Sequence, residues 1–149
     1  MATTQLPKDF KDFLSLLNSN DVEYLILGGY AVGYHGYPRP TGDLDIWVGV
    51  SSENARKLAA SLAAFGFVVP DLSESLFLEE RHVVRLGLPP IRIELLTSAS
   101  GVSFPQCYAR RVVDTIDGIS MNFISLQDLK VNKKASGRHK DLNDFENLP

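Results

Sequence analysis

The chain has 149 residues, of which 44% are hydrophobic and 22% charged, and this balance favours one globular domain over residues 1–149 with a sizeable core. Its formal net charge of −3 gives no overall attraction to nucleic acid, so a polyanion site would need a local cluster of basic side chains. No apolar stretch reaches the roughly 20 residues of a membrane span, and the start of the chain lacks the basic and then apolar order of a signal peptide. The single cysteine, Cys107, cannot form an internal disulfide. We therefore expect a cytoplasmic protein with no membrane partner.

Hydrophobic periodicity and chain breakers predict alternating helices and strands in the first half of the chain. In chain order we expect a helix from residue 7 with a polar stop at 18–21, a buried strand at 22–28, a short helix at 30–36, a stiff proline loop at 37–42, a strand at 43–50, a helix at 51–66 and a short edge strand at 67–69. Ser51 or Ser52 is the expected N-cap of the long helix, and Gly66 is its expected end.

The second half shows the same mixture. We expect strands at 82–87 and 91–97 around a turn at 88–90, a helix at 104–111, a hairpin at 111–125 that turns at Asp117-Gly118, and C-terminal helices at about 125–136 and 138–147. The whole pattern predicts a mixed β-sheet flanked by helices, of the α/β or α+β class, with the residues of about 125–147 as a helical C-terminal subregion.

Two aspartates stand at the start of a predicted strand, at Asp43 and Asp45 in "DLDIWV". Side chains alternate across a strand, so both project from one face while Leu44 enters the core from the other. In "IRIELLT" the same alternation puts Arg92 and Glu94 on one face, so Glu94 can meet the aspartates if the strands are neighbours. Three convergent carboxylates repel one another, and a divalent cation such as Mg²⁺ relieves that repulsion. The alternative is that Asp43 caps a turn and Asp45 is solvated at a strand edge.

The pair Gly28-Gly29 lies where a predicted strand meets a short helix. Glycines let the backbone approach a ligand closely, and the amides that open a helix favour an anion such as phosphate. A glycine turn, a short helix and an acidic pair on the next strand together place an anion cradle beside a metal site. Phosphoryl and nucleotidyl transfer require both.

These residues carry a family resemblance. "LGG", thirteen intervening residues and "DLDI", with a later carboxylate in "RIELL", resemble the core signature of the nucleotidyltransferase superfamily with the polymerase-beta-like fold. Within it the chain is similar to small bacterial and archaeal nucleotidyltransferase proteins related to the toxin half of abortive-infection toxin–antitoxin systems. The end of the chain, "ISLQDLKVNKKASGRHKDLNDFENL", resembles the helices that follow the catalytic sheet in such proteins.

The resemblance implies that Gly28 and Gly29 hold a triphosphate, that Asp43 and Asp45 are metal ligands, and that Glu94 is the third carboxylate. The metal is Mg²⁺ or Mn²⁺, and the third carboxylate helps to activate the acceptor hydroxyl. Two positions depart from the common pattern. Gly29 stands where many active members have serine, so only backbone amides are left to contact phosphate there, and Glu94 stands where aspartate is common.

Three further residues are candidates for nucleotide binding. Arg39 and Thr41 lie in the stiff loop before Asp43 and can reach phosphate, although they can equally be a surface arginine and a turn threonine. Lys133 aligns with a lysine of the family's C-terminal helices and lies in the most basic segment, 130–140. That segment can bind triphosphate or an RNA acceptor, or it can be a solvated face countered by Asp141 and Asp144. Within that segment we assign a phosphate role to Lys133 alone.

The resemblance and the acidic pair together predict a metal-dependent nucleotidyltransferase. It would transfer a nucleoside monophosphate from an NTP to a hydroxyl of RNA, protein or a small molecule. The alternative is a catalytically weak or inactive nucleotide-binding or regulatory module, one half of a toxin–antitoxin-type pair with a partner protein chain. Trp47 shares the face of the aspartates, where it can stack on a base or pack under a helix.

Overall fold

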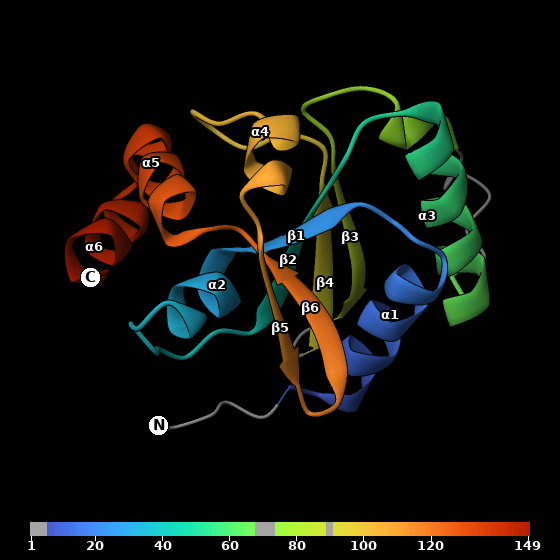
Figure 1. The fold of residues 1–149 in the computed structure, drawn as a ribbon, viewed down its shortest axis with the longest axis horizontal. Coiled ribbons are helices and arrows are strands. Elements are labelled where there is room, and N and C mark those ends of the chain that lie inside the picture. Colours follow the sequence, from blue (N-terminus) through green and yellow to red (C-terminus); the bar gives the residue numbers. More distant parts are fainter. Residues whose placement is uncertain (1–5, 68–73, 89–90) are drawn as a thin grey trace.

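A six-stranded mixed sheet forms the centre of the molecule in a computed structural model that describes residues 6–67, 74–88 and 91–149 (Figure 1). The strands are β1 (Tyr24–Leu27), β2 (Asp43–Val48), β3 (Val83–Leu88), β4 (Ile91–Leu96), β5 (Val112–Ile116) and β6 (Ile119–Phe123). Their order across the sheet is β3-β4-β2-β1-β6-β5. The pairs β2–β4 and β1–β6 are parallel and the other neighbours are antiparallel. The sheet is therefore mixed, as predicted.

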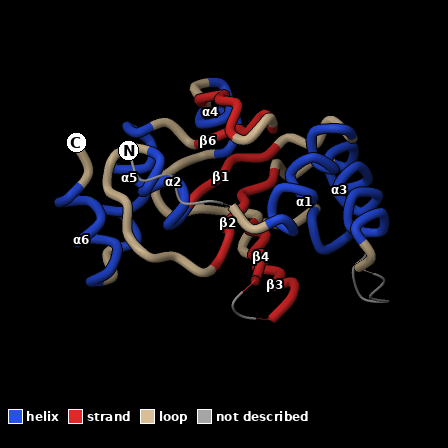
Figure 2. The backbone as a smooth tube through the Cα atoms, turned by 90° about the horizontal axis from the view of Figure 1, so that it is seen from below, coloured by secondary structure: helices blue, strands red, loops and turns tan. Residues whose placement is uncertain are grey.

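Helices cover both faces of this sheet (Figure 2). They are α1 (Lys8–Ser19), α2 (Gly28–Tyr34), α3 (Ser52–Phe65), α4 (Phe104–Ala109), α5 (Leu126–Ser136) and α6 (His139–Asn147), with a 3₁₀ turn at Glu74–Phe77. Helices α1 and α3 lie side by side on one face, and α2, α5 and α6 lie on the other side of the molecule (Figures 1 and 2). In the part of the chain that the structure describes, no helix has the length and apolar character needed to cross a membrane.

The layer of α1 and α3 buries the apolar face of the sheet. Helix α1 turns a fully buried stripe of Phe10, Phe13, Leu14 and Leu17 inward, which is the helical spacing that its sequence predicts. The long helix α3 begins at the predicted N-cap, where the Ser51 hydroxyl accepts a hydrogen bond of 3.1 Å from the Asn54 amide. It ends at Gly66, whose φ of +103° is the left-handed C-cap conformation that favours glycine.

The predicted elements agree with the structure within a few residues. Asp117 and Gly118 have φ values of +53° and +79°, so the hairpin turns where the sequence predicted it. The short helix begins at Gly28 itself, two residues earlier than expected. The 3₁₀ turn was not predicted, because a single short turn has no hydrophobic period to detect. The expected edge strand at 67–69 and the turn at 88–90 lie largely outside the described residues.

Candidate functional site

The three predicted carboxylates lie on one face of two neighbouring strands. Strands β2 and β4 run parallel with Asp43 opposite Arg92 and Asp45 opposite Glu94. Alternation turns the intervening Leu44 into the core, where it is 1% exposed. The acidic side chains consequently share the face that looks away from α1 and α3, because that layer packs on the apolar side.

Asp45 is the most perturbed of the three acids. Burial raises the pKa of its carboxyl to about 7, and the charge of Glu94, a hydrogen bond with Glu94 and the charge of Asp43 act in the same direction. Lys140, at the start of α6, opposes this shift through its positive charge. A carboxyl that is buried beside two others retains its proton near neutral pH unless a cation compensates it.

Two arginines that the sequence did not mark as functional hold the other carboxylates. Nη2 of Arg92 lies 2.8 Å from Oδ2 of Asp43 and 3.8 Å from Oε1 of Glu94. Nε of Arg85, on the edge strand β3, donates a 3.0 Å hydrogen bond to the same Oε1 of Glu94. The alternation of side chains along the strand places Arg92 on the same face as Glu94, and this sequence feature could have indicated that Arg92 belongs to the site. Its pairing with Asp43 depends on the strand register.

Buried polar atoms without partners gather on this face. Among the described residues, the buried side-chain nitrogen and oxygen atoms that have no hydrogen-bond partner are Oδ1 of Asp45, Nε1 of Trp47 and Nε of Arg92. Buried polar groups are normally satisfied, so unsatisfied ones are informative when they cluster. Oδ1 of Asp45 is an oxygen that a cation could use, and the all-carboxylate donor set suits Mg²⁺ or Mn²⁺.

The carboxylates are not arranged as a ready-made metal site. Within residues 6–67, 74–88 and 91–149, no group of three or more His, Cys, Asp or Glu side chains has a geometry that could hold a metal ion. Instead, Asp43 is paired with Arg92 and Glu94 with Arg85. The donor chemistry fits a divalent cation, but the side chains of the acidic group would have to move to bind one.

The glycine pair is packed tightly against the acidic group. Gly28 has a φ of +63°, and a Cβ at this position would overlap Oδ2 of Asp45. A Cβ at Gly29 would overlap the hydroxyl of Thr41 and lie 3.3 Å from Nη1 of Arg39. The glycines thus allow the start of α2 to touch both the acidic strand and the loop that precedes it.

Replacing Gly28 by Ala is expected to destabilise the protein by about 1–3 kcal/mol more than replacing Gly118 by Ala. Both glycines have positive φ, at +63° and +79°, but nothing lies within 4 Å of a Cβ at Gly118. The difference therefore isolates the overlap with Asp45. Urea unfolding of the two variants measures it, and equal losses of stability would show that Asp45 does not pack against this turn.

Two of the remaining predicted phosphate ligands, Arg39 and Lys133, are paired with acidic side chains of α6. Nε and Nη2 of Arg39 each lie 2.7 Å from a carboxylate oxygen of Asp144, which is fully buried. Lys133, 5% exposed, lies 3.0 Å from Asp144 and 3.2 Å from Asp141. These pairs join α5, α6 and the loop before β2 into one network. The phosphate roles of Arg39, Thr41 and Lys133 stay predictions.

The aromatic residues near the site act in packing. Trp47 is 2% exposed and meets Phe104 of α4 edge to face, with ring centroids 5.2 Å apart. Tyr34 of α2 stacks on Phe123 at 4.0 Å. His35 binds the Ile124 carbonyl through Nε2 at 2.7 Å.

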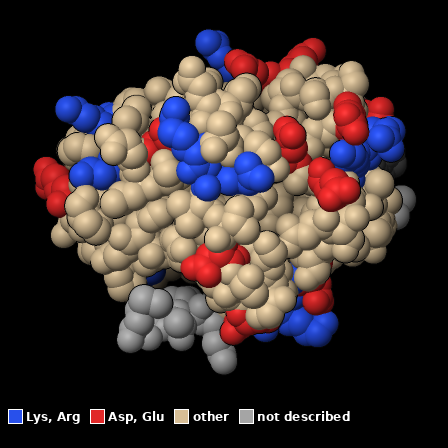
Figure 3. All heavy atoms as spheres, in the orientation of Figure 1, with Lys and Arg blue, Asp and Glu red and all other residues tan. Residues whose placement is uncertain are grey.

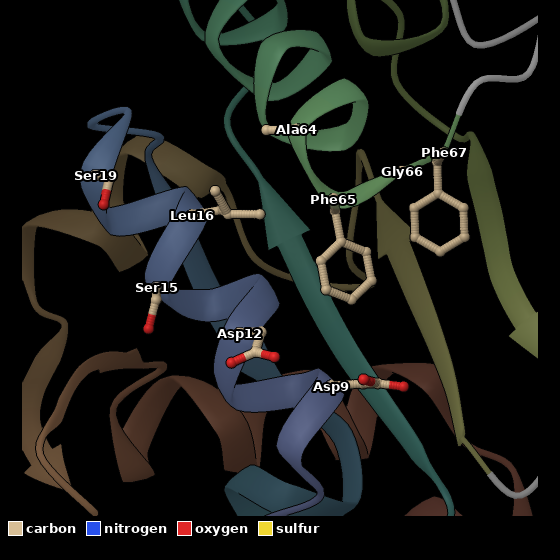
Figure 4. Close-up of a pocket in the computed structure, with 9 residues that line it drawn as sticks. All are labelled: Asp9, Asp12, Ser15, Leu16, Ser19, Ala64, Phe65, Gly66 and Phe67. Atoms are coloured by element: carbon tan, nitrogen blue, oxygen red, sulfur yellow. The ribbon is translucent and has the colours of Figure 1, made fainter.

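Two concave regions lie away from the carboxylates. A groove between α1 and the end of α3 is lined by Asp9, Asp12, Leu16, Phe65 and Phe67, among others, and contains none of the predicted site residues (Figure 4). A cavity of about 850 Å³ lies at the far ends of β2 and β4. On the face shown in Figure 3, basic and acidic side chains are scattered in small groups, some of them next to one another, with no continuous basic patch.

The sequence matches the model of one known protein family over nearly its whole length. Residues 4–148 match the model of a family described as nucleotidyltransferase of unknown function (DUF6036). The chain belongs to this family. No curated protein sequence matches it. The match covers the glycine turn, the acidic strands and the C-terminal helices together, as the resemblance predicted.

Solved structures share the fold at low sequence identity. A candidate nucleotidyltransferase from Thermotoga maritima superposes with a TM-score of 0.64 at 14% identity, over 92% of this chain and 88% of that chain. An antigenic nucleotidyltransferase-like protein from Paracoccidioides brasiliensis gives 0.53 at 18% identity, over 96% and 77%. ANT(2″)-Ia in complex with adenylyl-2″-tobramycin gives 0.52 at 14% identity, over 92% and 83%. These likenesses establish the nucleotidyltransferase fold of the chain.

Proposed function

We propose that the protein transfers a nucleoside monophosphate from an NTP to a hydroxyl group of RNA, protein or a small molecule. The observation that carries this proposal is the placement of Asp43, Asp45 and Glu94 on one face of β2 and β4, with Asp45 packed directly against Gly28. These carboxylates, which we propose as cation ligands, lie next to the turn where the family resemblance expects the triphosphate.

In the proposed reaction, different residues bind the cation, position the triphosphate and remove the proton of the acceptor. Asp43, Asp45 and Glu94 would hold Mg²⁺ or Mn²⁺, which when bound neutralises charge on the triphosphate and on the leaving pyrophosphate. The backbone of Gly28-Gly29 would position the triphosphate. A carboxylate oxygen of Glu94 would accept the proton of the acceptor hydroxyl while the hydroxyl oxygen forms a bond to the α-phosphorus. The bond between the α-phosphorus and the oxygen that bridges to the β-phosphate would break, and pyrophosphate would leave.

The similarity to known structures supports this reaction class. ANT(2″)-Ia was solved with adenylyl-2″-tobramycin, which is a nucleoside monophosphate joined to an acceptor molecule. At 14% identity that likeness does not indicate the acceptor of this chain.

We expect the protein to label an acceptor when it is incubated with each α-³²P-labelled NTP, Mg²⁺ or Mn²⁺, and total RNA and protein extracts. Label should enter one class of acceptor, with release of unlabelled pyrophosphate. The matched control is the Asp43→Asn/Asp45→Asn variant, which keeps side-chain volume and removes both aspartate charges. Label that appears equally with this variant would contradict the proposal.

A second candidate function is favoured by the arginine contacts. Because Arg92 and Arg85 hold Asp43 and Glu94, the same fold could serve as a regulatory module with weak or no catalysis, paired with a partner protein chain in a toxin–antitoxin-type system. Failure of the wild-type protein to bind either Mn²⁺ or any NTP at millimolar concentration, measured by calorimetry, would favour this candidate over the enzyme.

A further inference from the structure

Arg92 lies in the middle of the carboxylate group. On β4 it is opposite Asp43 of β2 on one side and opposite Gly87 of β3 on the other. A glycine at that position means that no β3 side chain stands directly opposite Arg92. The arginine therefore turns toward β2, where it meets Asp43 at 2.8 Å and comes within 3.8 Å of Glu94.

The oxygens that Arg92 approaches are the ones that the proposed cation needs. Oδ2 of Asp43 accepts a hydrogen bond from the guanidinium, and a cation placed at the same oxygen would stand next to a positive charge. Near a protein surface the positive charges of a divalent cation and a guanidinium repel each other strongly at such short range. The arrangement of the acidic group also differs from that of a metal site. Binding of a cation at that oxygen would therefore favour the release of Arg92 from Asp43.

A displaced Arg92 needs another anion. Its Nε is already buried without a hydrogen-bond partner, and its side chain is only 31% exposed, so free solvation of the head group is restricted. Glu94 is shared with Arg85 and is itself one of the proposed ligands. The anion that would arrive beside Asp43 and Asp45 is the triphosphate, and the planar guanidinium binds phosphate through two parallel hydrogen bonds.

We propose that Arg92 is a partner-exchanging residue, which holds Asp43 in the free protein and binds nucleotide phosphate when a divalent cation takes Asp43. This inference rests on the proposed function, since it concerns the same carboxylates. It goes beyond that function because it makes cation binding and triphosphate binding interdependent. Cation alone displaces Arg92 at a cost, whereas cation and triphosphate together give the guanidinium a new partner.

The test measures Mn²⁺ and inorganic tripolyphosphate by calorimetry, with no acceptor and no turnover. Replacing Arg92 by Gln is expected to tighten the binding of Mn²⁺ alone at least about tenfold, because the competing charge is gone. The same variant should bind tripolyphosphate, in the presence of excess Mn²⁺, at least about tenfold more weakly than wild type. Opposite changes exclude a purely structural arginine, which would alter both affinities in one direction, and Arg92→Lys separates the loss of the guanidinium contact from the loss of positive charge.

Three further variants make the test specific. Arg56→Gln removes an exposed arginine from α3 in the other layer and should leave both affinities unchanged. Arg85→Gln removes a partner of Glu94 whose side chain is 61% exposed, and its effect on Mn²⁺ should be smaller than that of Arg92→Gln. Arg92→Lys keeps the charge without the planar fork, so Mn²⁺ affinity should stay near wild type while tripolyphosphate affinity falls. Melting curves check that each variant is folded.

The outcomes separate this inference from the proposed function. If Arg92→Gln is folded and binds Mn²⁺ no more tightly than wild type, or binds tripolyphosphate equally well, partner exchange is wrong and the nucleotidyltransferase proposal stands. If neither wild type nor Arg92→Gln binds either ligand, both proposals fall.

Discussion

Replacing Asp45 by Asn is expected to lower nucleotidyl transfer at least about 100-fold and, in the same protein, to raise the melting temperature at pH 8 in EDTA. The gain in stability follows from the pKa of Asp45, which burial and then Glu94 raise from 3.8 to about 7. The folded state favours the protonated carboxyl, so the stability that this group contributes is fully present below about pH 4 and is lost as the pH rises to about 7. Asn retains the shape and removes the charge.

The expected gain in stability of Asp45→Asn is large enough to be measured as a change in melting temperature. A pKa difference of about three units corresponds to a stability effect on the order of 2–4 kcal/mol at pH 8, and each kcal/mol shifts the melting temperature of a chain of this length by about 2–4 °C. The difference between Asp45→Asn and wild type should shrink toward zero at pH 4. The control is Glu53→Gln, an exposed acid of α3 that pairs with Lys57, and it should change neither activity nor stability appreciably. A lower melting temperature for Asp45→Asn at pH 8 would instead show that the carboxylate is a structural partner.

The acidic face could be predicted from the sequence because it depends on local rules. Strand alternation places Asp43 and Asp45 together whatever the rest of the fold does, and the same rule places Glu94 with Arg92. The adjacency of β2 and β4 is not a local property, because parallel strands meet only through the packing of everything between them. From the sequence we could predict only that Glu94 meets the aspartates if the two strands are neighbours. The parallel pairing of β2 with β4 confirms that they are neighbours.

The pairing of the basic residues could not be predicted for the same reason. Arg92 lies 49 positions from Asp43, and Arg39 lies 105 positions from Asp144. At these separations the local spacing of residues cannot indicate that the two members of an ion pair meet. For Lys133 the alternative of a solvated face countered by nearby aspartates has the right partners, Asp141 and Asp144, but not the burial, which arises because α6 folds back against α5. Which of several basic side chains is free to meet a ligand is decided by these long-range contacts.

Replacing Asp144 by Asn is expected to be the most destabilising change considered, with a loss of about 3–5 kcal/mol and a fall in melting temperature on the order of 10 °C. Asp144 is fully buried and accepts two 2.7 Å hydrogen bonds from Arg39, while Nζ of Lys133 lies 3.0 Å away. Asn preserves the volume but leaves the buried Lys133 ammonium with Asp141 alone. Breaking one member of a buried charge network costs far more than losing a surface pair. The control is Asp12→Asn, which removes an exposed pair with Lys8 and should change stability by less than about 0.5 kcal/mol.

The dependence of this loss on pH has the opposite sign to that of Asp45. Burial disfavours the charged form of Asp144, but hydrogen bonds from Arg39 and Lys133 outweigh it and lower the pKa below 3.8. Its stabilising contribution is therefore present above about pH 4 and is lost as the pH falls through the lowered pKa, so the penalty of Asp144→Asn should be largest near neutrality and should diminish in acid. Thermal melts from pH 8 to pH 3 test both aspartates in one series. An Asp144→Asn protein as stable as wild type at pH 7 would mean that Arg39 and Lys133 are not needed to hold α6 in place, and it would favour their predicted role as phosphate ligands.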